Sequence, residues 1–294
     1  MKAIVFGGSG FLGSHVAETL TEKGYEVSIY DIKPSKYLIE GKQEMIVGDI
    51  LDADSIMAAV KGCDAVYDFA GLADLDSAST RPVDTVMLNV VGTCNIMDAC
   101  VSHKVKRFVY ASSFYANSDK GGFYRCSKQA AEIYIEEYSR KYGLDYTILR
   151  YGSLYGPRSD SNNGIRKMLG QALETGTVQY QGSGEETREY IHVKDAARLS
   201  VQILEEDYRN KHIVLTGHDA YKVKDIIRVM SEILNKELKV EYSNISSELH
   251  YDVTPYTYKP RSNYKLVNDF YHDLGQGLIE CLEEIDESGA WQNA

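Results

Sequence analysis

The chain has 294 residues, of which 44% are hydrophobic and 26% are charged, as in an ordinary globular protein of one or two closely joined domains. This composition disfavours a disordered or fibrous chain. The formal net charge of −11 disfavours a general affinity for nucleic acid or for an anionic membrane, so we expect neither as a partner.

Targeting and metal-binding signals are missing from the sequence. The first residues read as a strand that enters a glycine turn rather than as a secretory signal, and no uninterrupted apolar run approaches the roughly 18 residues that span a bilayer. The cysteines contain no Cys-x-x-Cys pair and the histidines no His-Glu-x-x-His motif. We therefore expect a cytoplasmic protein with reduced cysteines and no metal site.

Short apolar stretches alternate with helical patterns through the first half of the chain. The predicted strands are residues 2–6, 26–30, 44–47, 65–69, 107–111 and 146–149. The predicted helices are residues 11–23, 54–60, 85–102 and 123–142. This alternation predicts an α/β fold with a doubly wound parallel Rossmann sheet.

Beyond Arg150 the sequence becomes richer in loops. Further helices are predicted near residues 165–174, over 196–204 and in two amphipathic stretches after 223, and a strand over 212–215 rejoins the sheet. We expect a Rossmann domain over residues 1–152, to which residues 189–217 return. A smaller, interleaved C-terminal domain is expected from residues 153–188 and 218–294.

The glycine turn after the first strand is a candidate dinucleotide site. Gly7, Gly10 and Gly13 are spaced as Gly-x-x-Gly-x-x-Gly and open the first helix with Phe11 and Leu12. Backbone N–H groups and the dipole at such a helix start bind a pyrophosphate, and side chains there would block its approach. The alternative is a tight turn without a ligand, which this strand–turn–helix context disfavours.

An acidic residue follows at the distance expected for ribose recognition. Asp31 ends the second strand, eighteen residues beyond Gly13, and Ile32 follows it. A carboxylate there binds the adenosine hydroxyls and repels a 2′-phosphate, which favours NAD over NADP, although Lys33 weakens this preference. The alternative is a solvated aspartate at a strand end. Asp49-Ile50 is a candidate adenine contact after the third strand.

Tyr124 and Lys128 lie one helical turn apart on the same predicted face. An ammonium group near a phenol favours the phenolate, so such a tyrosine can act as a base. Tyr190 and Lys194 have the same spacing, but only Tyr124 follows the fifth strand and the hydroxyls of Ser112-Ser113. We therefore take the first pair as catalytic and the second as accidental.

Together these motifs resemble the NAD-dependent epimerase/dehydratase family of extended short-chain dehydrogenases/reductases, which acts on nucleotide sugars. The likeness runs from Met1 to about Asp195 and returns weakly near the C-terminus. The matching blocks are residues 7–13, 49–50, 89–93, 110–113, 124–128, 150–158 and 188–195.

The resemblance assigns roles to individual residues. It implies that Ser113, Tyr124 and Lys128 form a catalytic triad. The further cofactor contacts that it implies are Ala70, Gly71, Leu72, Asn89, Ser112, Tyr151, Ser153 and Leu154, with Tyr124 and Lys128. The substrate contacts that it implies are Ser113, Asn163, Arg261 and the anion-binding Arg188, whose bidentate fork suits a diphosphate.

The sequence departs from the family pattern after the catalytic serine. Phe114 and Tyr115 stand where dehydratases usually carry an acidic pair, which disfavours dehydration, and only eleven positions separate Ser113 from Tyr124. The resemblance thus implies an NAD-dependent nucleotide-sugar epimerase that acts at the sugar 4-position through a transient keto-sugar, similar to UDP-glucose 4-epimerase. The alternatives are a keto-sugar reductase or dehydrogenase with the same residues, and a non-catalytic NAD-binding regulator.

The family commonly forms homodimers through two helices of each subunit. We expect the helices over residues 86–99 and 123–142 to pair in this way, because both carry apolar residues on more than one face.

Overall fold

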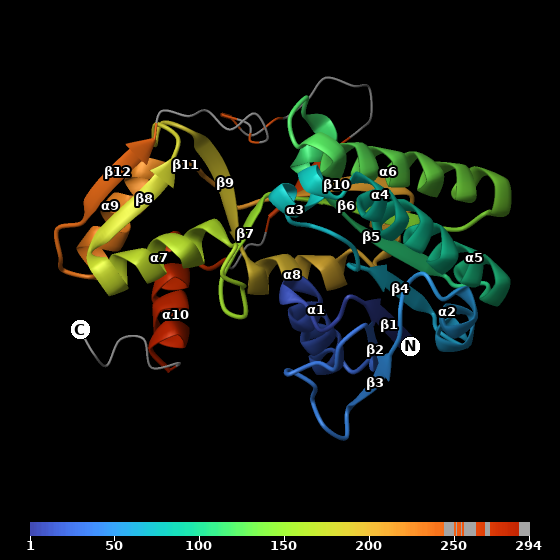
Figure 1. Cartoon of the computed structure of the whole chain (residues 1–294). Helices are drawn as coiled ribbons and strands as arrows, with labels where there is room; N and C mark the ends of the chain where they lie inside the picture. Colours follow the sequence, from blue (N-terminus) through green and yellow to red (C-terminus); the bar gives the residue numbers. More distant parts are fainter. Residues whose placement is uncertain (244–249, 251, 254, 256–262, 268–270, 288–294) are drawn as a thin grey trace.

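The computed structural model describes residues 1–243, 250, 252–253, 255, 263–267 and 271–287. Its centre is an eight-stranded sheet in the order β13-β10-β6-β5-β4-β1-β2-β3, and all neighbouring strands are parallel (Figure 1). The strands are β1 (Lys2–Phe6), β2 (Glu26–Asp31), β3 (Gln43–Val47), β4 (Ala65–Asp68), β5 (Arg107–Ser113), β6 (Tyr146–Tyr151), β10 (Lys211–Leu215) and β13 (Asn263–Leu266). The expected α/β doubly wound parallel sheet is confirmed.

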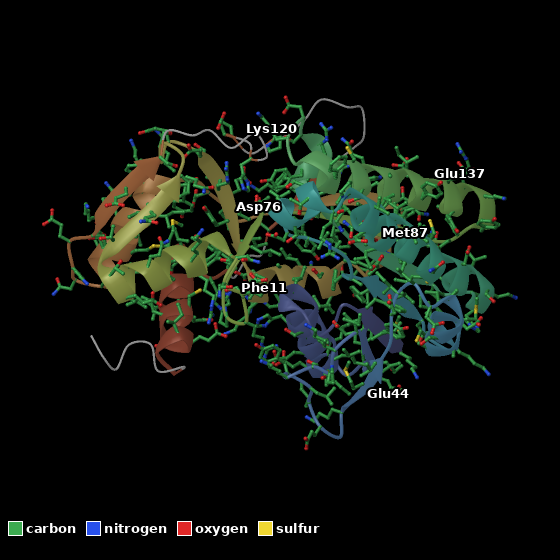
Figure 2. The ribbon with its side chains drawn as sticks, in the orientation of Figure 1. Phe11, Glu44, Asp76, Met87, Lys120 and Glu137 are labelled. Carbon is green, nitrogen blue, oxygen red and sulfur yellow. The ribbon has the colours of Figure 1, made fainter. Side chains whose placement is uncertain are left out.

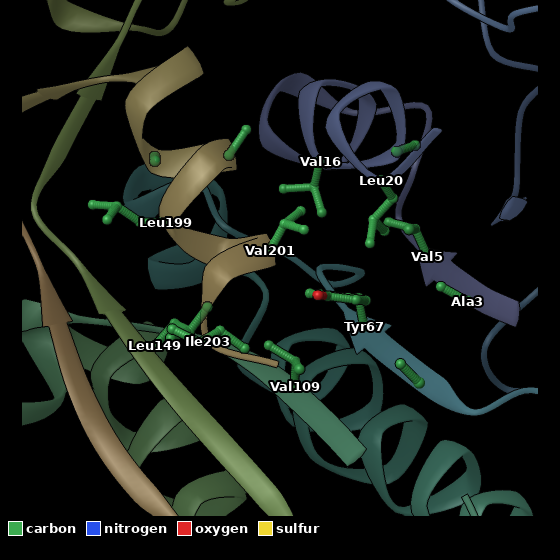
Figure 3. Packing of buried hydrophobic residues seen from close by; sticks show 14 of the residues in the cluster. Ala3, Val5, Val16, Leu20, Tyr67, Val109, Leu149, Leu199, Val201 and Ile203 are labelled. Carbon is green, nitrogen blue, oxygen red and sulfur yellow. The ribbon is translucent and has the colours of Figure 1, made fainter. Parts of the chain in front are cut away.

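Helices cover both faces of this sheet because alternate strand residues point to opposite sides. The helices are α1 (Phe11–Glu22), α2 (Ala53–Val60), α3 (Leu75–Thr80), α4 (Pro82–Val86), α5 (Thr93–His103), α6 (Gly122–Tyr142) and α8 (Val193–Gln202). In β1, Val5 faces the core under α1 and α8, whereas Phe6 faces the core under α2, α5 and α6. Figure 3 shows Val16 of α1 and Val201 of α8 near Tyr67 in the first of these cores.

The smaller lobe, which lies on the left in Figure 1, has its own hydrophobic core. Its strands are β7 (Ser153–Tyr155), β8 (Thr177–Gln181), β9 (Thr187–His192), β11 (Ala220–Lys222) and β12 (Lys239–Ser243). They form a three-stranded sheet, β11-β9-β7, and a two-stranded sheet, β12-β8. Three helices pack on them, α7 (Gly164–Thr175), α9 (Val223–Ile233) and α10 (Leu274–Glu287). Strand β9 leads directly into α8, so the chain passes between the lobes there.

The sequence predictions did not include α3 or the strands of the smaller lobe, and two further elements differ from them. The helix expected over residues 85–102 is a succession of α4, a π-helical turn (Met87–Gly92) and α5. Strand β13 lies in the stretch 218–294 that we assigned to the smaller domain, yet it pairs with β10 at the edge of the central sheet. The four residues of β13, Asn-Tyr-Lys-Leu, alternate between polar and apolar types, but so short a stretch does not by itself predict a strand, and its position depends on a long-range pairing. Two short 3₁₀ turns, Phe114–Asn117 and Glu206–Tyr208, complete the elements.

One stretch among the described residues meets the length and composition of a membrane span. Pro82–His103 is 22 residues long, and its most apolar window has a mean hydropathy of 1.3. Half of that window is buried within the protein, as in a helix of a protein core. Its composition is therefore weak evidence for a membrane span.

Candidate active site

The turn after β1 requires glycine at two of the predicted positions. Gly7 has a φ of +74°, and a Cβ added there would lie 2.7 Å from the carbonyl oxygen of Phe69. A Cβ on Gly13 would lie 2.2 Å from the carbonyl oxygen of Gly7. The backbone therefore turns sharply from β1 into α1, which begins at Phe11 and Leu12, and leaves its first N–H groups accessible to an anion. Figure 2 shows Phe11 at this end of α1.

A groove of about 280 Å³ runs along the carboxyl ends of β1, β2 and β4. It is lined by Gly7, Gly10, Tyr30, Asp31, Ile32, Gly48, Asp49, Ile50, Phe69, Ala70, Gly71 and Leu88. The fold thus brings the predicted glycine, acidic and Ala-Gly contacts to one groove, at the edge of a parallel sheet where nucleotides bind. Sequence reasoning missed Tyr30, Gly48, Phe69 and Leu88, although each adjoins a motif residue in the chain.

Asp31 is held beside the glycine turn by two backbone groups. The N–H of Ser9 donates to its Oδ2 over 3.0 Å, and the N–H of Lys33 donates to its Oδ1 over 3.1 Å. These bonds orient the carboxylate on the groove wall and leave each oxygen a further lone pair for a ligand hydroxyl. A glycine turn followed by a fixed carboxylate fits the pyrophosphate and the adenosine ribose of NAD.

Asn89 acts on the groove through the loop beside it. Its Oδ1 accepts a 2.7 Å hydrogen bond from the N–H of Leu72, and its Nδ2 donates to the carbonyl oxygen of Leu72 over 2.9 Å. The same Nδ2 lies 2.9 Å from the hydroxyl oxygen of Ser127 in α6. The buried amide therefore holds the Gly71-Leu72 backbone against the helix that carries Tyr124.

Tyr124 and Lys128 lie one turn apart on the buried side of α6. The Nζ of Lys128 donates a 2.7 Å hydrogen bond to the carbonyl oxygen of Ala111 in β5 and lies 5.7 Å from the centre of the Tyr124 ring. Burial lowers the pKa of Lys128 to about 8, against the opposing effect of Asp68 and Glu132. A buried ammonium group thus lies beside the phenol, as a lowered tyrosine pKa requires.

Asp68 and Glu132 are two buried acids that sequence reasoning missed. Burial raises the pKa of Asp68 to about 6, and its Oδ2 accepts a 2.8 Å hydrogen bond from Thr93. Glu132 lies one turn beyond Lys128, and this spacing along one helix face was the available signal. Its carboxylate accepts bonds from Ser112 Oγ at 2.6 Å and from Arg150 at 2.9 and 2.6 Å. The hydroxyl of Ser112 is therefore engaged with the helix.

Tyr115 contacts Tyr124 and His250 beside the end of β5, and the three side chains form one wall of the site. Ser113 ends β5, and its Oγ accepts a 3.3 Å hydrogen bond from the N–H of Tyr115. The Tyr115 and Tyr124 rings meet edge to face with their centres 6.2 Å apart, and the Tyr115 hydroxyl lies 2.7 Å from Nδ1 of His250. Burial, followed by the charge of Arg188, lowers the pKa of His250. Arg188 therefore lies within electrostatic reach of this wall, which also contains Tyr124.

Four further residues predicted to contact cofactor or substrate lie in different parts of the structure or outside its described residues. Asn163 caps α7 and donates to the carbonyl oxygen of Leu154 over 2.8 Å. The hydroxyl of Tyr151 is buried against Ser200, 2.6 Å away, so its side chain points into the core. Ser153 belongs to β7, and Arg261 lies outside the described residues.

The competing pair, Tyr190 and Lys194, does not share a helix. Tyr190 lies in β9, which ends at His192, whereas Lys194 lies in the first turn of α8. Their spacing of four residues therefore does not place them on one helical face, unlike that of Tyr124 and Lys128 in α6.

Comparison with known proteins agrees with this geometry. The model of the NAD dependent epimerase/dehydratase family matches residues 3–217. A putative UDP-glucose 4-epimerase of Methanocaldococcus jannaschii is 30% identical, over 68% of this chain and 72% of its own. A UDP-N-acetyl-alpha-D-glucosaminuronate decarboxylase of Bacillus cytotoxicus is 26% identical, over 81% and 82% of the two chains.

Solved structures share the whole architecture. The UDP-glucuronic acid 4-epimerase of Bacillus cereus, solved with UDP-glucuronic acid and NAD, superposes with a TM-score of 0.87 at 22% identity. The alignment covers 98% of this chain and 100% of that one. The chain is therefore an enzyme that uses NAD as its cofactor, and it belongs to the NAD-dependent epimerase/dehydratase family.

Proposed function

We propose that the protein is a nucleotide-sugar 4-epimerase that acts on a UDP-sugar. The observation that carries this proposal is the buried Lys128, which is anchored on Ala111 and adjacent to Tyr124. Asn89 ties the helix that contains this pair to Leu72, next to the groove residue Gly71. This arrangement supplies a base beside the cofactor, and the curated relatives include UDP-glucose 4-epimerases.

In the proposed mechanism Tyr124 removes the proton from the sugar 4-hydroxyl. Lys128 lowers the phenol pKa and binds the nicotinamide ribose, and Ser113 stabilises the developing oxyanion. NAD, which the glycine turn and Asp31 would hold in the groove, would supply a reversible acceptor for the hydride of the sugar carbon. The keto-sugar turns over in the cleft before Tyr124 gives the proton back, so the product differs only at one carbon and no net oxidation occurs.

The smaller lobe supplies the proposed binding site for the nucleotide part of the substrate. We assign Arg188 of β9 to the diphosphate, because its charge lies near the wall that contains Tyr115 and Tyr124. Asn163 and Arg261 remain proposed substrate contacts. Residues 1–152 and 189–217, with β13, would form the NAD-binding domain, and the rest of the chain the substrate domain.

Dehydration is the less suitable reaction for this site. A 4,6-dehydratase needs an acid and a base beside the sugar, and Phe114 and Tyr115 offer no carboxyl group there. Phe114 is fully buried, and Tyr115 pairs with His250.

The direct test is incubation of the purified protein with UDP-glucose and, separately, with UDP-glucuronic acid and UDP-N-acetylglucosamine. An epimerase yields the 4-epimer without net change in NADH absorbance, which chromatography of the nucleotide sugars detects. Stoichiometric NADH formation or consumption with a keto or reduced product would instead indicate a dehydrogenase or reductase.

A further inference from the structure

A cluster of two histidines and a glutamate lies apart from the proposed active site. His192 ends β9, His272 precedes α10, and Glu280 lies within α10. One potential ligand atom from each lies within 4.8 Å of the other two. The glutamate carboxylate spans the two rings: His192 Nε2 is 3.6 Å from Oε2, and His272 Nε2 is 3.6 Å from Oε1.

His192 is buried with its polar atoms unsatisfied. Its side chain is 0% exposed, and neither ring nitrogen has a hydrogen-bond partner among the described residues. A buried polar atom without a partner is destabilising, so a native structure normally gives it one. Both ring nitrogens therefore need a partner that the described part of the protein does not supply, and the one that carries no hydrogen has a lone pair that can bind a cation.

The other two residues are oriented by neighbours of the kind found around metal ligands. Asp195 accepts a 2.9 Å bond from the His272 backbone N–H, and its Oδ1 lies 3.1 Å from His272 Nδ1. Arg198 pairs with the same Asp195 and lies 3.2 Å from this Nδ1. If Nδ1 carries the hydrogen, it donates to Asp195, Arg198 donates to Asp195 alone, and Nε2 is left with a free lone pair, which is the carboxylate–histidine arrangement of zinc sites. Lys194 donates to Glu280 Oε2 over 2.7 Å, as a hydrogen bond to a ligating carboxylate.

We propose that His192, His272 and Glu280 bind one divalent transition-metal ion, with zinc as the best match to two imidazoles and a carboxylate. Zinc bonds of 2.0–2.1 Å in a tetrahedron separate neighbouring ligand atoms by about 3.4 Å. The two 3.6 Å histidine–glutamate distances are close to this value, and because they run to different oxygens they suit a carboxylate that faces the ion with both. A cavity of about 30 Å³ is lined by both histidines, which is room for one water molecule as the fourth ligand.

The position of the cluster indicates what the ion does. It joins β9, the strand that contains Arg188, to α10 of the smaller lobe. Without a metal, the same contacts form a network of ion pairs through Lys194, Asp195 and Glu280, and the buried His192 stays unsatisfied. The ion therefore acts as a structural clamp that is independent of the proposed epimerase chemistry.

The experiment uses the full-length protein after chelator treatment and desalting. Isothermal titration with zinc chloride should give one site, and cobalt chloride should produce the visible absorption of a tetrahedral Co²⁺ complex. Zinc at 100 times its Kd should raise the Tm by about 4 °C, from mass action on a chain of this size.

Two variants and a matched control decide whether these residues are the ligands. His272→Ala and Glu280→Gln should each weaken zinc binding at least roughly 100-fold and abolish the cobalt absorption, while circular dichroism shows that they remain folded. His218→Ala is the control, because His218 lines the same cavity but lies outside the proposed ligand set and is exposed. Absence of zinc and cobalt binding by the wild type, or unchanged binding by the two folded variants, would overturn the proposal.

Discussion

Lys128 of α6 donates a 2.7 Å hydrogen bond to the carbonyl oxygen of Ala111 in the central strand β5. This bond holds a buried ammonium group between the helix and the sheet. This contact keeps the lysine at a set distance from the Tyr124 ring, 5.7 Å from its centre. The chemistry that we propose depends on this one tyrosine, so it is the first residue to change.

Tyr124→Phe should lower turnover by roughly 10²–10⁴-fold, because the ring and its packing remain while the ionisable oxygen is lost. Folding and NAD affinity should stay nearly unchanged. Lys128→Met should lower turnover and also weaken NAD binding, because we assign that side chain two roles. Steady-state rates with whichever of the three UDP-sugars the wild type converts, and titration with NADH, measure both effects.

The internal control for this experiment is Tyr190→Phe. Its spacing to Lys194 matches that of the proposed catalytic pair, Tyr124 and Lys128, but Tyr190 and Lys194 lie on a strand and a separate helix. A folded Tyr190→Phe enzyme that loses turnover, or a Tyr124→Phe enzyme that keeps it, would show that the wrong tyrosine was chosen.

Asp31 should make the protein prefer NADH over NADPH. Its carboxylate is fixed beside the glycine turn by the N–H groups of Ser9 and Lys33, where it would repel a 2′-phosphate. Fluorescence titration of the wild type should give the lower Kd for NADH, and Asp31→Ala should reduce the difference. Tighter binding of NADPH by the wild type would contradict this assignment.

Glu132→Gln should destabilise the protein by about 3–5 kcal/mol, because it leaves the guanidinium of Arg150 buried without its carboxylate. The pair is almost fully buried, with Nη2 of Arg150 2.6 Å from Oε2 of Glu132. Urea denaturation measures the loss. Glu132→Gln combined with Arg150→Met should recover part of it, and a single variant as stable as wild type would be incompatible with this reasoning.

His15 should make the protein less stable in acid. Burial, followed by the charge of Arg158, lowers the pKa of His15 to about 4 from its usual 6.5, so between these values the unfolded chain binds more protons than the folded one. Stability from this residue is full above pH 6.5 and falls as the pH drops towards 4, by on the order of 3 kcal/mol. His15→Gln keeps a donor for the carbonyl oxygen of Pro157 and should flatten the urea-midpoint profile over that range. If the urea midpoint of this variant fell equally steeply with pH, His15 would not be the cause of the loss of stability in acid.

Homodimer formation is proposed through the apolar surface of the π-helical turn, α5 and α6. Exposed apolar side chains on these segments include Met87, Val91, Phe123 and Ile133. Sedimentation should give twice the 33.0 kDa of one chain, and Ile133→Glu should shift the protein towards the monomer. Val47→Glu is the control, because Val47 is as exposed as Ile133 but lies on the edge strand β3. A wild-type monomer at micromolar concentration would refute the dimer.

The sequence by itself determined the features that depend on neighbouring residues. The glycine turn, Asp31 and the Tyr124–Lys128 pair each occupy one strand end, turn or helical face, so their geometry follows from spacing along the chain. The alternation of strands and helices determined the parallel sheet in the same way, since a strand of continuous apolar residues is buried on both faces.

Only the tertiary structure decided the features that join distant segments. Strand β13 became an edge of the central sheet by pairing with β10, and Asn89 came to hold Leu72 instead of pointing freely into the groove. His192, His272 and Glu280 are separated by up to 88 positions, so no local spacing indicates that they meet. Contacts of this kind arise from the packing of whole elements, which brings together residues whose chemical relationship has no period or motif in the sequence.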